Sequence, residues 1–203
     1  MDTNRNKADW DRCVEFHGHE CPGLALGFAV AQAGLKWLRA HRSSDEEVVA
    51  VVENDACSVD AVQVLTGCTF GKGNLIHLDY GKQVYTFFNR GSGAAIRFAL
   101  RPNATPVDDR YRELMLRNRD GVVTPEEKRE LAERRDGIIQ AILTGPVDEL
   151  FAVSDPAGKL PPKALVQKSE ICPVCGEPVM PQKMAEINGR RVCRGCASKE
   201  VSE

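Results

Sequence analysis

Two separate groups of cysteines carry the chemistry that this sequence could perform. Cys172, Cys175, Cys193 and Cys196 form a C-x2-C-x17-C-x2-C array near the carboxyl end. Two such pairs of thiolates complete the tetrahedral four-sulfur site that structural zinc prefers. A closed site of this kind has no open coordination position, so we predict structural zinc here and no catalysis. In so small a module the bound metal would supply most of the folding free energy.

The second group lies near the amino end, where His17, His19 and Cys21 fall within five positions. Imidazole and thiolate are soft metal ligands, so His19 and Cys21 are candidate ligands of a second metal, for which zinc is one candidate. Cys57 is the preferred third ligand. It directly precedes a predicted helix, whose positive end would lower the pKa of its thiol. Asp60, three residues later, could orient an imidazole or a bound water.

An alternative mechanism makes the same core residues catalytic without a metal. In it, Cys57 is a nucleophile or redox thiol and His17 or His19 is its base, with Asp60 available to orient the imidazole. Cys68 is a further candidate ligand of the core metal, because it follows a helix-ending glycine in a glycine-rich turn. The residues alone leave open which of these side chains coordinate a metal.

The segment 67–74 superficially resembles a phosphate-binding loop. The P-loop pattern needs four residues between its first glycine and its Gly-Lys-Ser/Thr end. Only three residues separate Gly67 from Gly71, and Gly73 follows the lysine. We therefore predict a tight turn rather than a nucleotide-binding loop, with Lys72 available for an anionic group of a cofactor.

A mixture of helices and strands must position these residues. The β-branched run Val48–Val52 predicts a buried strand, and Ser58–Thr66 predicts a short helix with Ser58 capping its amino end. Leu75–Leu78 and Val84–Phe88 flank a turn and predict a β-hairpin. Further strands are expected at 94–100 and 151–153, and helices at 7–16, 24–41, 108–118 and 125–143. Strict βαβ alternation is absent, so the predicted class is α+β, with mixed helices and a mainly antiparallel sheet.

The length and composition predict one core domain with a small appendage. A chain of 203 residues with 42% hydrophobic residues can bury a sizeable core. The proline-rich run Leu160–Lys163 indicates a semi-rigid linker. We therefore expect a core domain over 1–159, a linker over 160–169 and a four-cysteine zinc-ribbon-like module over 170–203.

The charge pattern narrows the classes of partner. Lys and Arg number 27 against 29 Asp and Glu, and the segment 170–203 carries five of each sign. Because phosphate contacts need net positive charge, nucleic acid is disfavoured, whereas a protein partner of the zinc module stays open. The longest apolar stretch, Leu24–Val30, is too short to span a bilayer, and the amino end lacks a run of signal-peptide length. We predict a cytoplasmic protein without membrane contact.

Three motifs together resemble the FmdE family, which is named after an operon neighbour of formylmethanofuran dehydrogenase. They are the runs His17-Gly-His-Glu-Cys-Pro-Gly23, Asp55-Ala-Cys-Ser-Val-Asp-Ala-Val-Gln63 and Thr66-Gly-Cys-Thr-Phe-Gly-Lys-Gly-Asn74. The resemblance covers roughly residues 12–150, and some members carry a C-terminal zinc-ribbon-like module. It implies a usually homodimeric α+β core with a metal-binding pocket. Carried over by motif, that pocket comprises His17, His19, Cys21, Cys57, Asp60 and Cys68.

Two classes of function follow from the residues and the resemblance. The first is a metal-binding protein whose core pocket performs metal-assisted or thiol-based chemistry, or handles a metal or cofactor. The alternative is a dimeric adaptor or regulatory protein whose zinc module binds a partner protein or nucleic acid. Delivery of a metal or cofactor to a molybdenum enzyme is a third candidate. The sequence names no substrate and no reaction.

Overall fold

The computed structural model describes residues 3–156 and 158–200. The chain divides into two compact units, Met1–Lys163 and Ala164–Glu203. The larger unit combines helices with a five-stranded sheet, and the smaller unit holds two two-stranded sheets and a short helix. This arrangement confirms the predicted α+β class. No helix among the described residues is both long enough and apolar enough to cross a bilayer.

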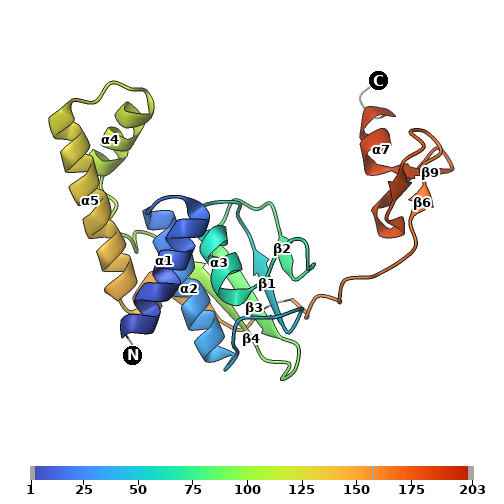
Figure 1. Ribbon diagram of the computed structural model, residues 1–203, viewed down its shortest axis with the longest axis horizontal. Coiled ribbons are helices and arrows are strands. Elements are labelled where there is room, and N and C mark those ends of the chain that lie inside the picture. Colours follow the sequence, from blue (N-terminus) through green and yellow to red (C-terminus); the bar gives the residue numbers. More distant parts are fainter. Residues whose placement is uncertain (1–2, 157, 201–203) are drawn as a thin grey trace. The chain divides into compact units, whose positions relative to one another are not determined.

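The larger unit begins with helices and ends with a strand (Figure 1). Its helices are α1 (Thr3–His17), α2 (Pro22–Trp37), α3 (Ser58–Thr66), α4 (Asp109–Arg119), α5 (Pro125–Thr144) and α6 (Val147–Leu150). Its strands are β1 (Val48–Val52), β2 (Leu75–His77), β3 (Val84–Asn89), β4 (Ala95–Leu100) and β5 (Phe151–Ser154). They run in the order β2-β1-β3-β4-β5, with β2 parallel to β1 and every other neighbouring pair antiparallel.

The predicted hairpin of Leu75–Leu78 with Val84–Phe88 is wrong. Strand β1 lies between the two segments and pairs with both, as Val52 does with His77 on one side and with Tyr85 on the other. Four of the five residues of this strand are buried, which agrees with its place between two neighbouring strands, because a strand that is apolar on both faces belongs inside a sheet rather than at its edge. Helix α3 makes the crossover from β1 to its parallel neighbour β2.

Helix α2 packs closely against both α3 and the sheet. A Cβ atom placed on Gly27 would lie 2.0 Å from the carbonyl oxygen of Ser58, at the start of α3. A Cβ atom on Gly34 would lie 2.5 Å from the ring of Phe87 in β3. Both glycines therefore permit backbone approaches that a side chain would prevent. Helices α1, α2 and α3 are seen together over the sheet in Figure 1.

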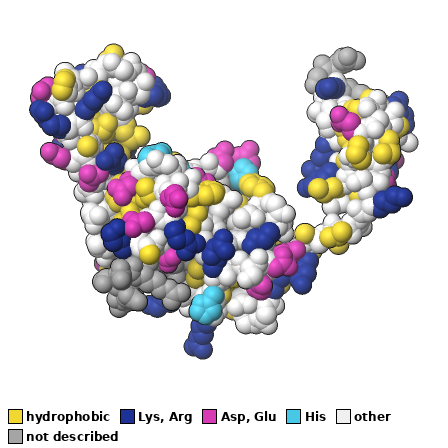
Figure 2. Space-filling model, in the orientation of Figure 1, with side chains coloured by type: hydrophobic (Ala, Val, Ile, Leu, Met, Phe, Trp, Pro, Cys, Tyr) yellow, Lys and Arg dark blue, Asp and Glu magenta, His cyan; other side chains and the backbone are white. Residues whose placement is uncertain are grey.

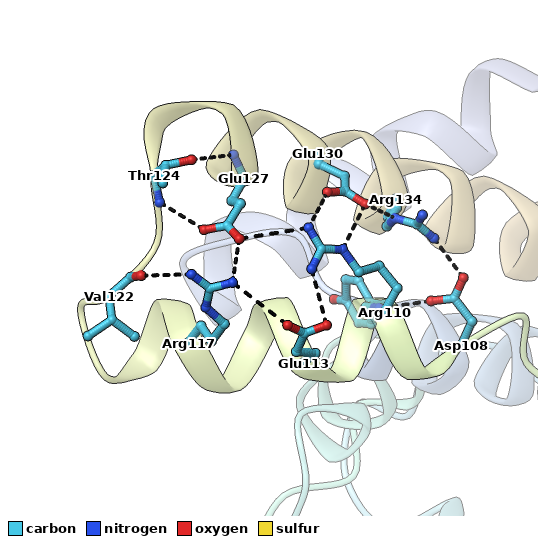
Figure 3. Close-up of polar contacts among 10 residues, drawn as sticks. Asp108, Arg110, Glu113, Arg117, Val122, Thr124, Glu127, Glu130 and Arg134 are labelled. Atoms are coloured by element: carbon cyan, nitrogen blue, oxygen red, sulfur yellow. Dashed lines mark hydrogen bonds and ion pairs between the residues drawn. The ribbon is translucent and has the colours of Figure 1, made fainter.

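Helices α4 and α5 form a hairpin that projects from the larger unit (Figure 1). Arg110 contacts Glu130 at 2.8 Å and Arg134 contacts Asp108 at 2.6 Å, within the ion-pair network of Figure 3. The guanidinium groups of Arg110 and Arg134 lower the pKa of Glu130 to about 2. Because water and salt screen exposed pairs of this type, the network links the two helices but contributes little to stability. Thr124 and Glu127 form a capping box at the amino end of α5.

The smaller unit consists of short elements. They are β6 (Glu170–Ile171), β7 (Pro178–Val179), a 3-10 turn (Pro181–Lys183), β8 (Met184–Ile187), β9 (Arg190–Cys193) and α7 (Arg194–Glu200). Strands β8 and β9 form a hairpin through Asn188 and Gly189, which have φ values of 52° and 72°. Two successive positive φ angles are what an Asn-Gly hairpin turn requires. The smaller unit has a small buried core of Cys172, Val192 and Ala197.

Replacing Gly27 by alanine tests the close approach of α2 and α3. We expect Gly27→Ala to lower the free energy of unfolding by about 1–3 kcal/mol, since the added methyl must push the backbone of Ser58 away. Denaturant unfolding followed by circular dichroism measures the change. Gly137→Ala is the matched control, because Gly137 lies within α5 with no atom within 4 Å of its missing Cβ. The control should be neutral or stabilising by about 0.5–1 kcal/mol. Equal stabilities of the two variants would contradict the packing argument.

Candidate metal centre and zinc module

Three helix ends meet where the amino-terminal motif predicts a site. His17 is the last residue of α1, and Cys21 is the N-cap residue of α2. Gly18, with φ +90°, makes the turn between these helices, a conformation that favours glycine. The Sγ atom of Cys21 accepts a hydrogen bond from the backbone N–H of Leu24 at 3.3 Å. Asp60 comes from the first turn of α3.

His17 is held between Asp60 and Cys21. Its Nδ1 lies 2.7 Å from Oδ2 of Asp60, and its Nε2 lies 3.7 Å from Sγ of Cys21. A carboxylate at Nδ1 favours the tautomer that leaves the Nε2 lone pair free to bind a metal. With Zn–N of about 2.0–2.1 Å and Zn–S of about 2.3 Å, a tetrahedral zinc needs N and S about 3.6 Å apart. The observed separation of the two atoms fits that requirement.

His19 completes a group of three metal-type ligands. One ligand atom from each of His17, His19 and Cys21 lies within 4.8 Å of the other two. The rings of His17 and His19 have centroids 4.5 Å apart. The loop is anchored beside them, because Trp10 donates a hydrogen bond from Nε1 to Glu20 at 3.1 Å. His17 and Cys21 are half-buried and His19 is exposed, so the group faces solvent on one side.

Cys57 lies beside Cys21 but outside the three-ligand group. A Cβ atom on Gly23 would lie 3.8 Å from the sulfur atoms of both Cys21 and Cys57, so this glycine allows the two side chains to approach. Burial, with a smaller contribution from the nearby Cys57, raises the pKa of Cys21 to about 11. Cys57 also occupies the N-cap position of α3. The predicted capping by Ser58 is therefore wrong, and the Ser58 hydroxyl instead donates to Oδ1 of Asn54 at 3.2 Å.

Two residues of the predicted core site lie elsewhere in the described structure. The thiol of Cys68 is fully buried and donates to the carbonyl oxygen of Val48 at 3.3 Å. Burial raises its pKa to about 11, as expected for a core thiol. The amino group of Lys72 donates to the carbonyl oxygens of Ser43 and Ser44 at 3.3 and 3.4 Å. The structure does not bring either side chain to the His/Cys group.

The four C-terminal cysteines converge as predicted. One sulfur atom from each lies within 4.8 Å of the other three, and the sulfur atoms of Cys175 and Cys193 are 4.0 Å apart. A tetrahedral zinc with bonds of about 2.3 Å would place its sulfurs about 3.8 Å apart. The backbone N–H of Cys193 donates to Sγ of Cys172 at 3.3 Å, and this contact is the main cause that lowers the pKa of Cys172 to about 6. A thiolate is thus favoured where zinc needs one.

Comparison with known proteins identifies both units. Residues 16–152 match the family described as FmdE, molybdenum formylmethanofuran dehydrogenase operon. The chain belongs to the FmdE family. Residues 168–201 match the prokaryotic dksA/traR C4-type zinc finger, which agrees with the four converging sulfurs and supports structural zinc in this FmdE protein.

Two similar proteins extend the comparison of this FmdE chain. A probable S-adenosyl-L-methionine-binding protein of Archaeoglobus fulgidus is 30% identical over 198 residues, which cover 92% of this chain and 51% of that protein. The FmdE chain thus spans about half the length of this relative. A crystal structure of a tungsten formylmethanofuran dehydrogenase FmdE-like protein from Syntrophus aciditrophicus superposes with a TM-score of 0.57 and 23% identity. The match covers 96% of this chain and 92% of that one, which shows a shared fold.

Reasoning from the residues alone named His17 only as a candidate base, although the family resemblance included it in the metal-binding pocket. The structure puts its Nε2 beside Cys21 and its Nδ1 on Asp60. The sequence contains a signal for this contact, because His17 and Cys21 are close in the chain and the intervening Gly18, with φ +90°, makes the tight turn that brings them together. The pairing with Asp60 is 43 residues distant in sequence and depends on the packing of α1 on α3.

Removing one cysteine of the zinc finger should unfold that unit alone. We expect Cys193→Ser to release its zinc, because three thiolates hold the ion far less tightly than four, and metal binding supplies most of the folding free energy of such modules. Amide NMR signals of residues 168–200 should collapse to unfolded positions, while signals of the larger unit remain. The exposed Lys199→Ala is the control and should keep both. A folded Cys193→Ser finger without zinc would contradict this account.

Proposed function

We propose that the FmdE core holds a zinc-type ion between His17, His19 and Cys21 and presents one open position to a small ligand. The observation that carries the proposal is the placement of His17, with Nδ1 2.7 Å from Asp60 and Nε2 3.7 Å from the Cys21 sulfur. Three protein ligands with an open fourth position are typical of catalytic rather than structural zinc. The exposure of His19 leaves a route from solvent to that position.

The chain's own residues prepare the site for metal-assisted chemistry. When bound, such an ion supplies Lewis-acid activation of the small ligand. Asp60 fixes the orientation of the His17 ring through its Nδ1. The backbone N–H of Leu24 stabilises the thiolate form of Cys21 by donating to its sulfur. Cys57, beside Cys21, is the thiol that we place next to the small ligand rather than among the three ligands.

Counting metal ions tests the ligand set. Purified full-length protein should contain two zinc equivalents per chain, and Cys21→Ser should contain one, because only the core site loses a ligand. Cys57→Ser should keep two equivalents, which separates our ligand set from one in which Cys57 replaces His17. Cys68→Ser is a further control, as the Cys68 thiol contacts a backbone carbonyl. Two equivalents in Cys21→Ser would refute the core metal site.

Asp60 should act on the metal only through His17. We expect Asp60→Asn to weaken core zinc binding by about 10–100-fold, since the imidazole loses its charged anchor. Competition with a chromophoric chelator measures the affinity while the finger zinc serves as an internal reference. Asp155→Asn, at an exposed position after β5, is the matched control and should leave the affinity unchanged. An unchanged zinc affinity in Asp60→Asn would contradict the claim that Asp60 orients the His17 ring for metal binding.

For the zinc finger we propose contact with a partner protein. Its charged side chains balance, which disfavours phosphate contacts. Ile171, Val174 and Met180 expose 64%, 46% and 58% of their surfaces, and apolar side chains of this kind make up protein contacts. S-adenosyl-L-methionine is the first small ligand to test at the core site, because the Archaeoglobus relative is named for binding it.

A further inference from the structure

A small hollow adjoins the proposed metal centre on the far side of Asp60. It has a volume of about 210 Å³ and lies at the carboxyl ends of the parallel strands β1 and β2, where Val52 and His77 face each other in register. The amino-terminal part of α3 forms another wall, with Asp60 and Gln63. In sheets with parallel strands, ligands bind in the crevice outside the carboxyl ends of those strands.

The charges that line the hollow are negative. Asp55 and Asp60 are both in its wall, and its lining contains neither lysine nor arginine. Asp55 is exposed, and its carboxylate has no hydrogen bond or ion pair within the described part of the chain. The amino end of α3 contributes the equivalent of about half a positive charge, and the proposed ion together with the Cys21 thiolate adds one more, which the two carboxylates still outweigh. The hollow therefore favours a cation over an anion, although it lies at a helix amino end.

An aromatic side chain adds an apolar wall to the hollow. Phe70 is 68% exposed at the edge of the hollow, and an aromatic face attracts organic cations. His77 also lines the hollow, and its Nε2 atom is buried without a hydrogen-bond partner among the described residues. Basic and acidic side chains are mixed over the surface that is visible in Figure 2.

We infer that the hollow binds a small organic cation, an alkylammonium group with an apolar arm, and holds it beside the metal centre. Asp55 and Asp60 would pair with the cationic head, and Phe70 would pack on the arm. Sites for drug-sized ligands have volumes of about 300–1,000 Å³, so this one takes a fragment-sized group. The inference rests on the proposed function, because Asp60 both orients His17 and lines the hollow.

A matched pair of ligands and variants tests this assignment on the zinc-loaded full-length protein. The probes are n-pentylammonium and 1-pentanol, which differ in the cationic group, and binding is followed by amide NMR shifts of residues 52–60, 70 and 77. We expect saturable ammonium binding with a Kd of about 1–10 mM. 1-Pentanol should bind the unmodified protein at least about fivefold more weakly than n-pentylammonium does. n-Pentylammonium should bind Asp55→Asn and Phe70→Ala at least about fivefold more weakly than it binds the unmodified protein. Asp155→Asn should bind as the unmodified protein does.

The same samples separate this inference from the metal proposal. Neither Asp55 nor Phe70 is a proposed ligand, so both variants should keep two zinc equivalents and an unchanged unfolding midpoint. Equal binding of ammonium and alcohol, absence of saturation, or full ammonium affinity in Asp55→Asn would overturn the cation site while the core metal stands. A single zinc equivalent in the unmodified protein would instead refute the metal centre. The ammonium titration would then decide whether the hollow binds a cation without a metal beside it.

Discussion

The close approach of α3 to α2 is the constraint on which the core site depends. Gly27 lets the backbone of Ser58 approach α2, and Gly23 leaves room for Cys57 beside Cys21. This contact fixes the amino end of α3, and α1 packs on the same helix. Asp60 is thereby brought to His17 from 43 residues away. The site is a product of three helix ends meeting rather than of any one motif.

The zinc finger and the proposed metal site of the core differ in the structure that surrounds them. The finger gathers four sulfurs on a unit whose buried core is three residues, so its metal has an architectural role. The core group offers three candidate ligands on a scaffold that is already packed by α2, α3 and the sheet. Because the packing of that scaffold does not depend on an ion, the metal that we propose there would be free to take part in ligand binding and chemistry.

Local signals in the sequence predicted several elements well. The strand Val48–Val52 and the helix Ser58–Thr66 match the structure, because each depends on residues within one element. The hairpin prediction failed because β1, which lies earlier in the chain, pairs between the two segments, and local turn signals contain no information on pairing with a distant segment. Likewise the four-cysteine spacing identified the finger, whereas the role of His17 required tertiary packing. The homodimer implied by family resemblance stays a prediction.

Anomalous X-ray scattering at the zinc edge, on crystals of the full-length protein, tests the central claim most directly. We predict two peaks per chain. One should lie among the four finger sulfurs, and the other about 2.0–2.1 Å from Nε2 of His17 and about 2.3 Å from Sγ of Cys21. His19 should supply the third ligand, with Cys57 outside bonding distance. A single peak in the finger, with the His17–Asp60 pair intact and no density between His17 and Cys21, would contradict the account.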